Sequence, residues 1–142
     1  MLLPQERTVI YFITCCTHSR QKCLDSQQAH EAILTAWQRL PNWLVGRYTI
    51  MPDHLHFFAL PFSREANLSN FMQAFRALVT RQLRPANFPY PLWQREFFDH
   101  ILRSGENYEE KWNYVWLNPV RHQLVAEPGD WPYSGEINRL AL

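Results

Sequence analysis

No apolar run in this sequence approaches the roughly 20 residues that a membrane-spanning helix needs. The first residues, MLLPQER, lack the apolar segment of a secretory leader. Three cysteines (Cys15, Cys16 and Cys23) are an odd number without the spacing of zinc ligands. We therefore expect a reduced, cytoplasmic protein with no membrane segment.

The sequence also lacks internal repeats, low-complexity segments and a strong net charge, which is +1 over 142 residues. It is 46% hydrophobic and 15% aromatic, which predicts one globular domain over residues 1–142. The near-zero balance hides a basic segment, residues 64–84, in which four arginines face one glutamate, and an acidic segment, residues 104–112. A basic helix is typical both of a solvated surface and of a nucleic-acid site.

Periodicity and turn residues predict four strands and three helices. We expect strands at 7–17, 43–51, 54–60 and 92–103, and helices at 25–40, 66–83 and 104–118, with an irregular tail over 119–142. The order is β-α-β-β-α-β-α. It predicts an α+β, ferredoxin-like fold: a four-stranded antiparallel sheet with two helices on one face and an extra C-terminal helix.

Two histidines interrupt the apolar run MPDHLHFFALP at 51–61. His54 and His56 are two residues apart, so in a strand both side chains point to the same face. A polar patch would explain one buried histidine more easily than two, because each imidazole needs a partner. Imidazole is a common metal ligand, and two of them leave coordination positions for a substrate oxygen.

The extra helix carries two stripes at helical spacing. Tyr108, Trp112, Val115 and Trp116 form an apolar stripe, whereas Asn107, Lys111, Tyr114 and Asn118 form a polar one. Tyr114 and Asn118 are one turn apart and therefore neighbours. A phenol, an amide and an ammonium on one stripe suit a nucleophile, a metal ligand and a charge stabiliser, although most helical tyrosines only pack or hydrogen-bond.

These residues resemble a known family. MPDHLH is similar to the His-hydrophobic-His (HUH) motif of single-tyrosine transposases, and YVWLNPVRHQLV (114–125) resembles the tyrosine motif of their REP-associated branch. WQREFFDHILRS (93–104), WPYS (131–134) and YFITCCTHSRQ (11–21) also match that branch, so the resemblance spans nearly the whole chain. Two positions depart from it: His122-Gln123 replaces the usual Ala-Gly, and Asp53 stands where Asn is frequent.

The resemblance implies a metal-dependent enzyme that nicks and rejoins single-stranded DNA at hairpin repeats. His54 and His56 would bind Mg²⁺ or Mn²⁺, and Asn118 would supply a third ligand. Tyr114 would attack a phosphodiester and form a 5′-phosphotyrosine, leaving a 3′-OH. A phenol has an ordinary pKa near 10, so it must be activated, and Lys111 is our hypothesis for part of that field. Related enzymes include monomers and homodimers.

DNA contacts are predicted more loosely. The phosphate-binding candidates are Arg64, Arg76, Arg81, Arg84, Arg95, Arg103, Lys111 and Arg121. Trp93 and Phe88 are candidates for stacking on unpaired bases, although most aromatic residues belong to a core. Asp99 and His100 receive no role.

Two other functions compete with the enzyme. The first is a descendant that binds repeat hairpins without cutting them, which would not need the complete set of His54, His56, Tyr114 and Asn118. The second is a ferredoxin-like RNA-binding module. That module would leave the histidine pair unexplained, and the glycine-aromatic strand motif of RNA-recognition domains is absent from the sequence.

Overall fold

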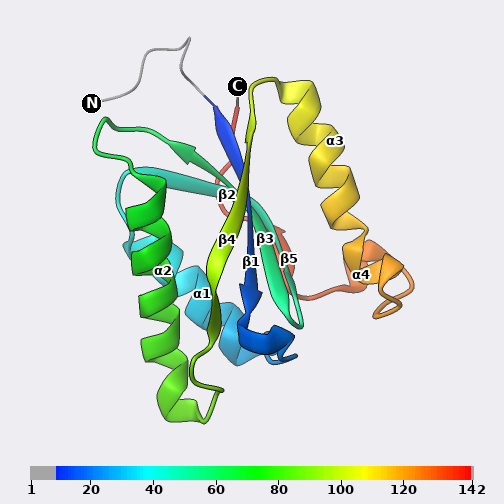
Figure 1. Cartoon of the computed structure of the whole chain (residues 1–142). Helices are drawn as coiled ribbons and strands as arrows, with labels where there is room; N and C mark the ends of the chain where they lie inside the picture. The colour runs from blue at the N-terminus through cyan, green and yellow to red at the C-terminus, as the bar shows by residue number, and fades with distance from the viewer. Residues whose placement is uncertain (1–8, 142) are drawn as a thin grey trace.

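A five-stranded antiparallel sheet forms the centre of the molecule (Figure 1). The structure, a computed structural model, describes residues 9–141. The strands are β1 (Ile10–Thr17), β2 (Trp43–Met51), β3 (His54–Pro61), β4 (Trp93–Leu102) and β5 (Ser134–Glu136), in the spatial order β4-β1-β3-β2-β5. The first four strands have the predicted ferredoxin-like order, with β1 and β3 in the centre.

Helices α1 (Gln27–Arg39) and α2 (Leu68–Leu83) cover one face of the sheet, as predicted. Ser26 caps α1 by accepting from the Ala29 N–H, and Asn67 caps α2 by accepting from the Asn70 N–H. Their buried stripes meet the odd-numbered residues of β3, so that Phe57 packs against Trp37 and Phe75. This is the main hydrophobic core.

Helix α3 (Gly105–Trp116) lies over the opposite face (Figure 1). It begins at Ser104, whose hydroxyl accepts from the Asn107 N–H. Tyr108 and Val115 are buried with Phe58 in a second, smaller core. The predicted apolar stripe therefore packs on the sheet. A short helix, α4 (Asn118–Arg121), follows, and Pro119 lies in its first turn, where proline is tolerated.

The prediction of an irregular tail over 119–142 and of a four-stranded sheet is wrong in one respect. The tail contains α4, the 3₁₀ turn η4 (Pro128–Asp130) and β5, which pairs with β2 as a fifth strand. Trp131 anchors this segment by donating from Nε1 to the Ile50 carbonyl at 2.9 Å. Two further 3₁₀ turns, η2 (His18–Arg20) and η3 (Arg84–Ala86), follow β1 and α2. Across residues 9–141, every helix is too short or too polar to cross a bilayer.

Candidate active site on the sheet face below helix α3

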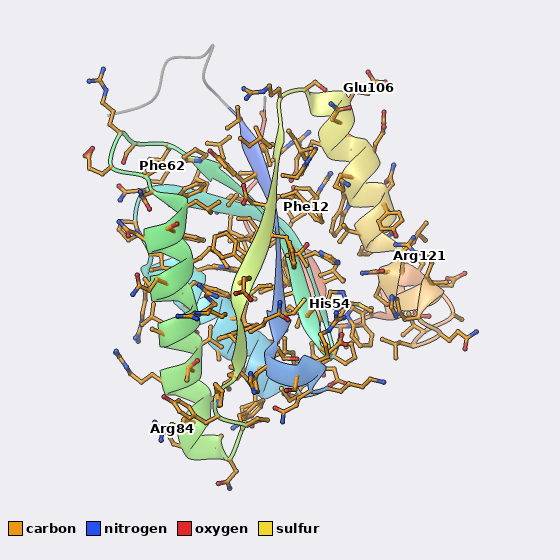
Figure 2. All side chains as sticks on the ribbon, in the orientation of Figure 1. Phe12, His54, Phe62, Arg84, Glu106 and Arg121 are labelled. Carbon is orange, nitrogen blue, oxygen red and sulfur yellow. The ribbon has the colours of Figure 1, made fainter. Side chains whose placement is uncertain are left out.

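The two histidines lie on the central strand and, like Phe58, face the side of the sheet that α3 covers. Figure 2 shows His54 on that side. Strand alternation sends Leu55 and Phe57 into the α1/α2 core and turns His54, His56 and Phe58 the other way. The two imidazole rings have centroids 4.8 Å apart at an interplanar angle of 76°. The predicted same-face pair is therefore confirmed in geometry.

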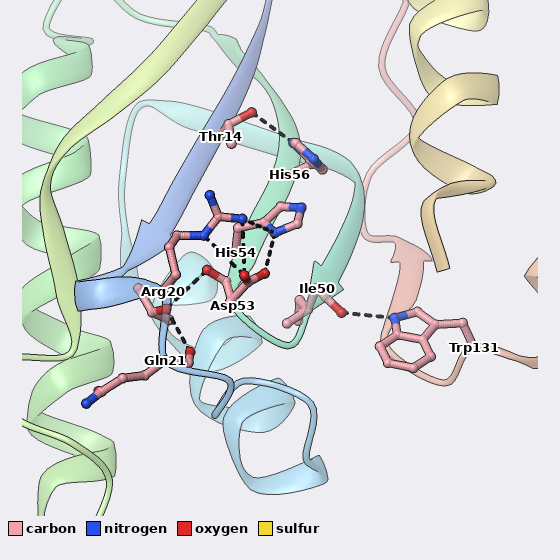
Figure 3. A network of polar contacts seen from close by, with 9 residues as sticks. Thr14, Arg20, Gln21, Ile50, Asp53, His54, His56 and Trp131 are labelled. Carbon is pink, nitrogen blue, oxygen red and sulfur yellow. Dashed lines mark hydrogen bonds and ion pairs between the residues drawn. The ribbon is translucent and has the colours of Figure 1, made fainter. Parts of the chain in front are cut away.

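Each imidazole has a hydrogen-bond partner at Nδ1 (Figure 3). Asp53 Oδ1 lies 2.7 Å from His54 Nδ1, and Thr14 Oγ1 lies 2.8 Å from His56 Nδ1. Partners of this kind fix the orientation of metal-binding histidines. In both rings Nε2 is the nitrogen left for a ligand or substrate.

Arg20 holds Asp53 in place from a different segment of the chain. Its guanidinium approaches Asp53 Oδ2 at 3.1 Å through both Nε and Nη2. Ser19 and Arg20 adopt left-handed backbone angles, with φ of 56° and 54°. The chain therefore turns sharply after β1, and this turn is fastened to the β2–β3 turn because the Thr17 N–H donates to the Asp53 carbonyl.

Both histidines are held in the neutral form that binds metals. Burial lowers the pKa of His54, and the Asp53 carboxylate only partly opposes this effect. Burial, followed by His54 and the charges of Lys111 and Arg121, lowers the pKa of His56 to about 3. Burial alone would raise the pKa of Asp53, but the contacts with His54 and Arg20 bring it below its ordinary value. In the Asp53–His54 pair, an ionised carboxylate therefore accepts a hydrogen bond from the Nδ1–H of a neutral ring.

Lys111 reaches from α3 toward the histidines. Its Nζ lies 5.2 Å from the centre of the Phe12 ring, and Phe12 stacks on His56 at 5.3 Å. Lys111 also lines a surface hollow together with Tyr114 and His100. The predicted polar stripe of α3 thus places a cation beside Phe12 and in the same hollow as the candidate nucleophile.

Tyr114 and Asn118 are joined by Arg121 rather than by the histidines. The Arg121 guanidinium lies 3.8 Å from the centre of the Tyr114 ring and donates to the Tyr114 carbonyl and, at 3.3 Å, to Asn118 Oδ1. Tyr114 is 61% exposed, whereas Asn118 is buried. Among the contacts within residues 9–141, none joins Tyr114 to His54 or His56.

The residues around the histidine pair fit a divalent cation in part. Two neutral imidazoles with free Nε2 atoms are suitable ligands. Within residues 9–141, however, His, Cys, Asp and Glu side chains form no group of three that could hold a metal ion. Further ligands would have to be oxygen atoms of another kind, such as those of an amide, a backbone carbonyl or water.

The arginines predicted to bind DNA do not form one patch. Arg81, Arg84 and Arg95 line a common groove. The guanidinium of Arg76 instead donates hydrogen bonds to the carbonyls of Gln94 and Arg95, at 3.1 and 2.6 Å. Arg64 precedes α2 and Arg84 follows it directly. Because α2 has 16 residues, its axis separates the two arginines by about 24 Å.

The predicted stacking roles of Trp93 and Phe88 find no support in the fold. Trp93 is buried, and Phe88 packs against the main core, so neither ring offers a face to a base. The exposed aromatic residues nearby are Tyr90 and Phe98. Phe98 pairs with Thr14, which pairs in turn with His56, so all three lie on one row of the sheet.

Sequence reasoning missed several residues that support the site. Thr14 and Arg20 are far from the histidines along the chain, and no local pattern marks them. Asp53 precedes His54 directly, so the dipeptide Asp-His was a usable signal. His122, noted only as a departure from the family pattern, lies with its ring 6.4 Å from that of His54.

Comparisons with known proteins agree with this arrangement. A family model described as "Transposase IS200 like" matches residues 6–115, a stretch that includes Tyr114 but ends before Asn118. A Haemophilus influenzae protein named as a REP-associated tyrosine transposase is 30% identical over 138 residues, covering 88% of this chain and 78% of that protein. The REP-associated tyrosine transposase of Escherichia coli is 28% identical over 91 residues, and the match covers 63% of this chain and 52% of that protein.

The fold is also found among solved structures. The structure of a REP-associated tyrosine transposase bound to a REP hairpin superposes with a TM-score of 0.75 at 22% identity, covering 94% of this chain and 78% of that one. A transposase structure from Deinococcus radiodurans gives a TM-score of 0.55 at 14% identity.

Proposed function

The chain belongs to the IS200-like transposase family, in its REP-associated tyrosine branch, and from this we propose that it nicks and rejoins single-stranded DNA beside hairpin repeats. The observation that carries the proposal is the histidine pair. Two neutral imidazoles on a central strand, each with Nδ1 engaged and Nε2 free, serve no purpose in packing a core.

In this proposal His54, His56 and Asn118 hold Mg²⁺ or Mn²⁺. When bound, the cation withdraws charge from a phosphate oxygen and orients the phosphodiester. The hydrogen bonds with Asp53 and Thr14 hold the two imidazole rings in the orientation needed to bind the cation. Asn118 would have to exchange its hydrogen bond from Arg121 for this role.

Tyr114 acts as the nucleophile. Its oxygen forms a bond to phosphorus, the bond from phosphorus to the 3′ oxygen breaks, and the products are a 5′-phosphotyrosine and a 3′-OH. Because the new ester conserves the energy of the broken one, a hydroxyl can rejoin the strand without ATP. The ammonium of Lys111 lines the same hollow as Tyr114, and in this proposal it stabilises the negative charge of the phosphate under attack.

The test is a covalent adduct. The protein is incubated with Mn²⁺ and a labelled hairpin carrying single-stranded flanks, and the products are separated on a denaturing gel. We expect an adduct that Tyr114→Phe abolishes and that the control Tyr11→Phe retains, since Tyr11 packs against Trp43 in the main core.

Two results would overturn the proposal. An adduct that survives in Tyr114→Phe would place the nucleophile elsewhere. The absence of any adduct across the hairpin repeats of the host, with hairpin binding intact, would favour the binding-only function. One observation favours this binding-only function: Tyr114 contacts Arg121 and not the histidines.

A further inference from the structure

One arginine on β2 contacts both α3 and β5. The guanidinium of Arg47 lies 2.8 Å from a Glu109 carboxylate oxygen on α3 and 3.5 Å from one of Glu136 on β5. Its central carbon also lies 5.2 Å from the centre of the Tyr108 ring and 5.5 Å from that of Trp112, both on α3. The candidate active site does not include Arg47, so the proposed reaction leaves these contacts unexplained.

A β-bulge directs Arg47 toward α3. The register of β2 against β3 shifts between Val45 and Tyr48, so that Gly46 and Arg47 together lie opposite Phe58 alone. Bulges of this kind increase the local twist of a strand and redirect a side chain, and they are common next to active sites. Phe58 faces α3, and therefore the bulge presents Arg47 to the same helix.

Glycine is required beside Arg47 because α3 comes very close to the backbone of β2. A Cβ atom at Gly46 would lie 2.7 Å from the Leu140 side chain and 3.1 Å from the Tyr108 hydroxyl. Since this space has no side chain of its own, Tyr108 packs directly against the strand. The helix is thereby brought within reach of the Arg47 guanidinium.

The strand that carries Arg47 also borders the histidines. Thr49, two residues further along β2, pairs with His56 on β3. On the helix, Trp112 is two residues before Tyr114. Arg47 therefore joins the strand next to the histidine pair to the helix that carries the candidate nucleophile.

The remaining attachment of α3 to the sheet is small. Of the 12 residues of this helix, Tyr108 and Val115 are buried. Six buried residues form the core beneath it, compared with 22 in the α1/α2 core. The Arg47 side chain is only 22% exposed, so its charge is screened less than that of a fully solvated arginine. Arg47 can therefore supply a substantial share of the interactions that fix α3.

We propose that Arg47 is a positioning residue for Tyr114: it fixes α3 on β2 and keeps the tyrosine on the sheet face that carries the histidines of its own chain. Arg47 acts through the helix and has no contact with the reacting groups. The role of Tyr114 rests on the proposed function, but the attachment of α3 by Arg47 does not require cleavage.

The first experiment needs neither DNA nor metal. Hydrogen exchange of peptides covering residues 105–116 is measured by mass spectrometry. Arg47→Met keeps the aliphatic stem but removes the charge, and should speed exchange in α3 roughly tenfold, the lower end of what two cation–π contacts and an ion pair contribute together. Arg47→Lys keeps the charge without the planar guanidinium and should give an intermediate rate. The matched control is Arg39→Met, at the exposed end of α1, which should leave α3 unchanged.

The second experiment separates positioning from DNA binding. Adduct formation with Mn²⁺ is followed at saturating concentrations of the labelled hairpin. A displacement of about 1 Å can cost on the order of 100-fold in rate, so Arg47→Met should slow the reaction roughly 10- to 100-fold. Glu109→Gln, which removes the shorter ion pair from the helix side, should slow it in the same direction. The affinity for the hairpin, measured by fluorescence anisotropy without metal, should be the same in both variants as in the wild type.

Three results would overturn the inference. Unchanged exchange in α3 of Arg47→Met would show that Arg47 does not hold the helix. Equal acceleration of exchange in α3 and α2 would assign Arg47 to the stability of the whole fold. A loss of hairpin affinity as large as the loss of rate would make Arg47 a DNA ligand.

A mixture of two inactive proteins tests whether α3 stays on its own chain. Tyr114→Phe protein is mixed with protein in which His54 and His56 are both replaced by alanine, and we expect no adduct. An adduct would show that the tyrosine serves the histidines of a partner chain, and would contradict the proposed role of Arg47. If the wild-type protein never forms an adduct but exchange in α3 depends on Arg47, the cleavage proposal fails and the attachment of α3 stands.

Discussion

Asp53 is the residue whose removal tests the proposed metal site most directly. Its carboxylate lies 2.7 Å from Nδ1 of the largely buried His54. Hydrogen bonds to charged groups contribute about 1.5–3 kcal/mol. Loss of such a partner typically costs 10- to 100-fold in metal affinity. We therefore expect Asp53→Ala to weaken Mn²⁺ binding by that range, or about 1.4–2.7 kcal/mol.

Asp53→Asn separates geometry from charge. The amide oxygen can still accept a hydrogen bond from His54 Nδ1, but the negative charge and the ion pair with Arg20 are lost. We expect a loss nearer tenfold, so that affinity falls in the order wild type, Asp53→Asn, Asp53→Ala. Asn is frequent at this position in the family that the sequence resembles. We therefore expect Asp53 to support His54 more strongly in this chain than an Asn at the same position would.

The assay is titration calorimetry with Mn²⁺ in the absence of DNA, with ¹⁵N NMR of the imidazoles as a second readout. The spectrum of the wild-type protein should show His54 with its proton on Nδ1, and Asp53→Ala should shift the balance toward Nε2. Asp99→Asn, on the exposed edge strand β4, controls for the loss of a carboxylate. The reasoning fails if Asp53→Ala binds Mn²⁺ within twofold of wild type, or if wild-type His54 carries its proton on Nε2.

Three further predictions use the same contacts. Because the folded-state pKa of His56 is about 3 against an ordinary 6.5, the unfolded chain binds the proton first. Urea unfolding free energy should therefore be fully retained above pH 6.5 and decline between 6.5 and 3, with a weaker decline in His56→Gln. Lys111→Ala should slow adduct formation at constant pH and salt, whereas an unchanged rate would remove Lys111 from the chemistry. Arg121→Ala should release Tyr114 and Asn118, visible as faster quenching of tyrosine fluorescence by acrylamide relative to Arg39→Ala, and equal quenching would show that the ring is not held.

The parts of the fold that follow from local patterns could be predicted from the sequence. Alternation in 54–61 predicts the face of each side chain, and Ser26 and Ser104 mark helix starts because a hydroxyl there satisfies an unpaired N–H. Strand β5 could not be predicted. It has only three residues, one of them glycine, and it exists because β2 offers an open edge.

The features of the candidate site likewise fall into those that local sequence patterns predict and those that depend on the whole fold. The spacing of His54 and His56 predicts a shared face, because two residues in a strand complete one period. The placement of Arg20 depends on two consecutive left-handed residues and on a turn bonded to the β2–β3 hairpin. These features depend on the assembled fold, so no local sequence pattern could predict them. The same holds for Arg121, whose reach to Tyr114 depends on how α4 turns after α3.

The proposed mechanism requires Tyr114 to reach a phosphate held at the histidines, and two movements could achieve this at different energetic cost. Moving α3 as a body would expose Tyr108 and Val115, which are buried against Phe58, at a cost of roughly 1.5–3 kcal/mol for each side chain. Rotating the Tyr114 side chain breaks only its contact with Arg121, which at an exposed site is worth about 0.5–1 kcal/mol. In the proposed complex, DNA phosphates would also compete for Arg121, which would lower that cost further. The cheaper movement keeps α3 packed on its own sheet, and so it favours an active site assembled within one chain.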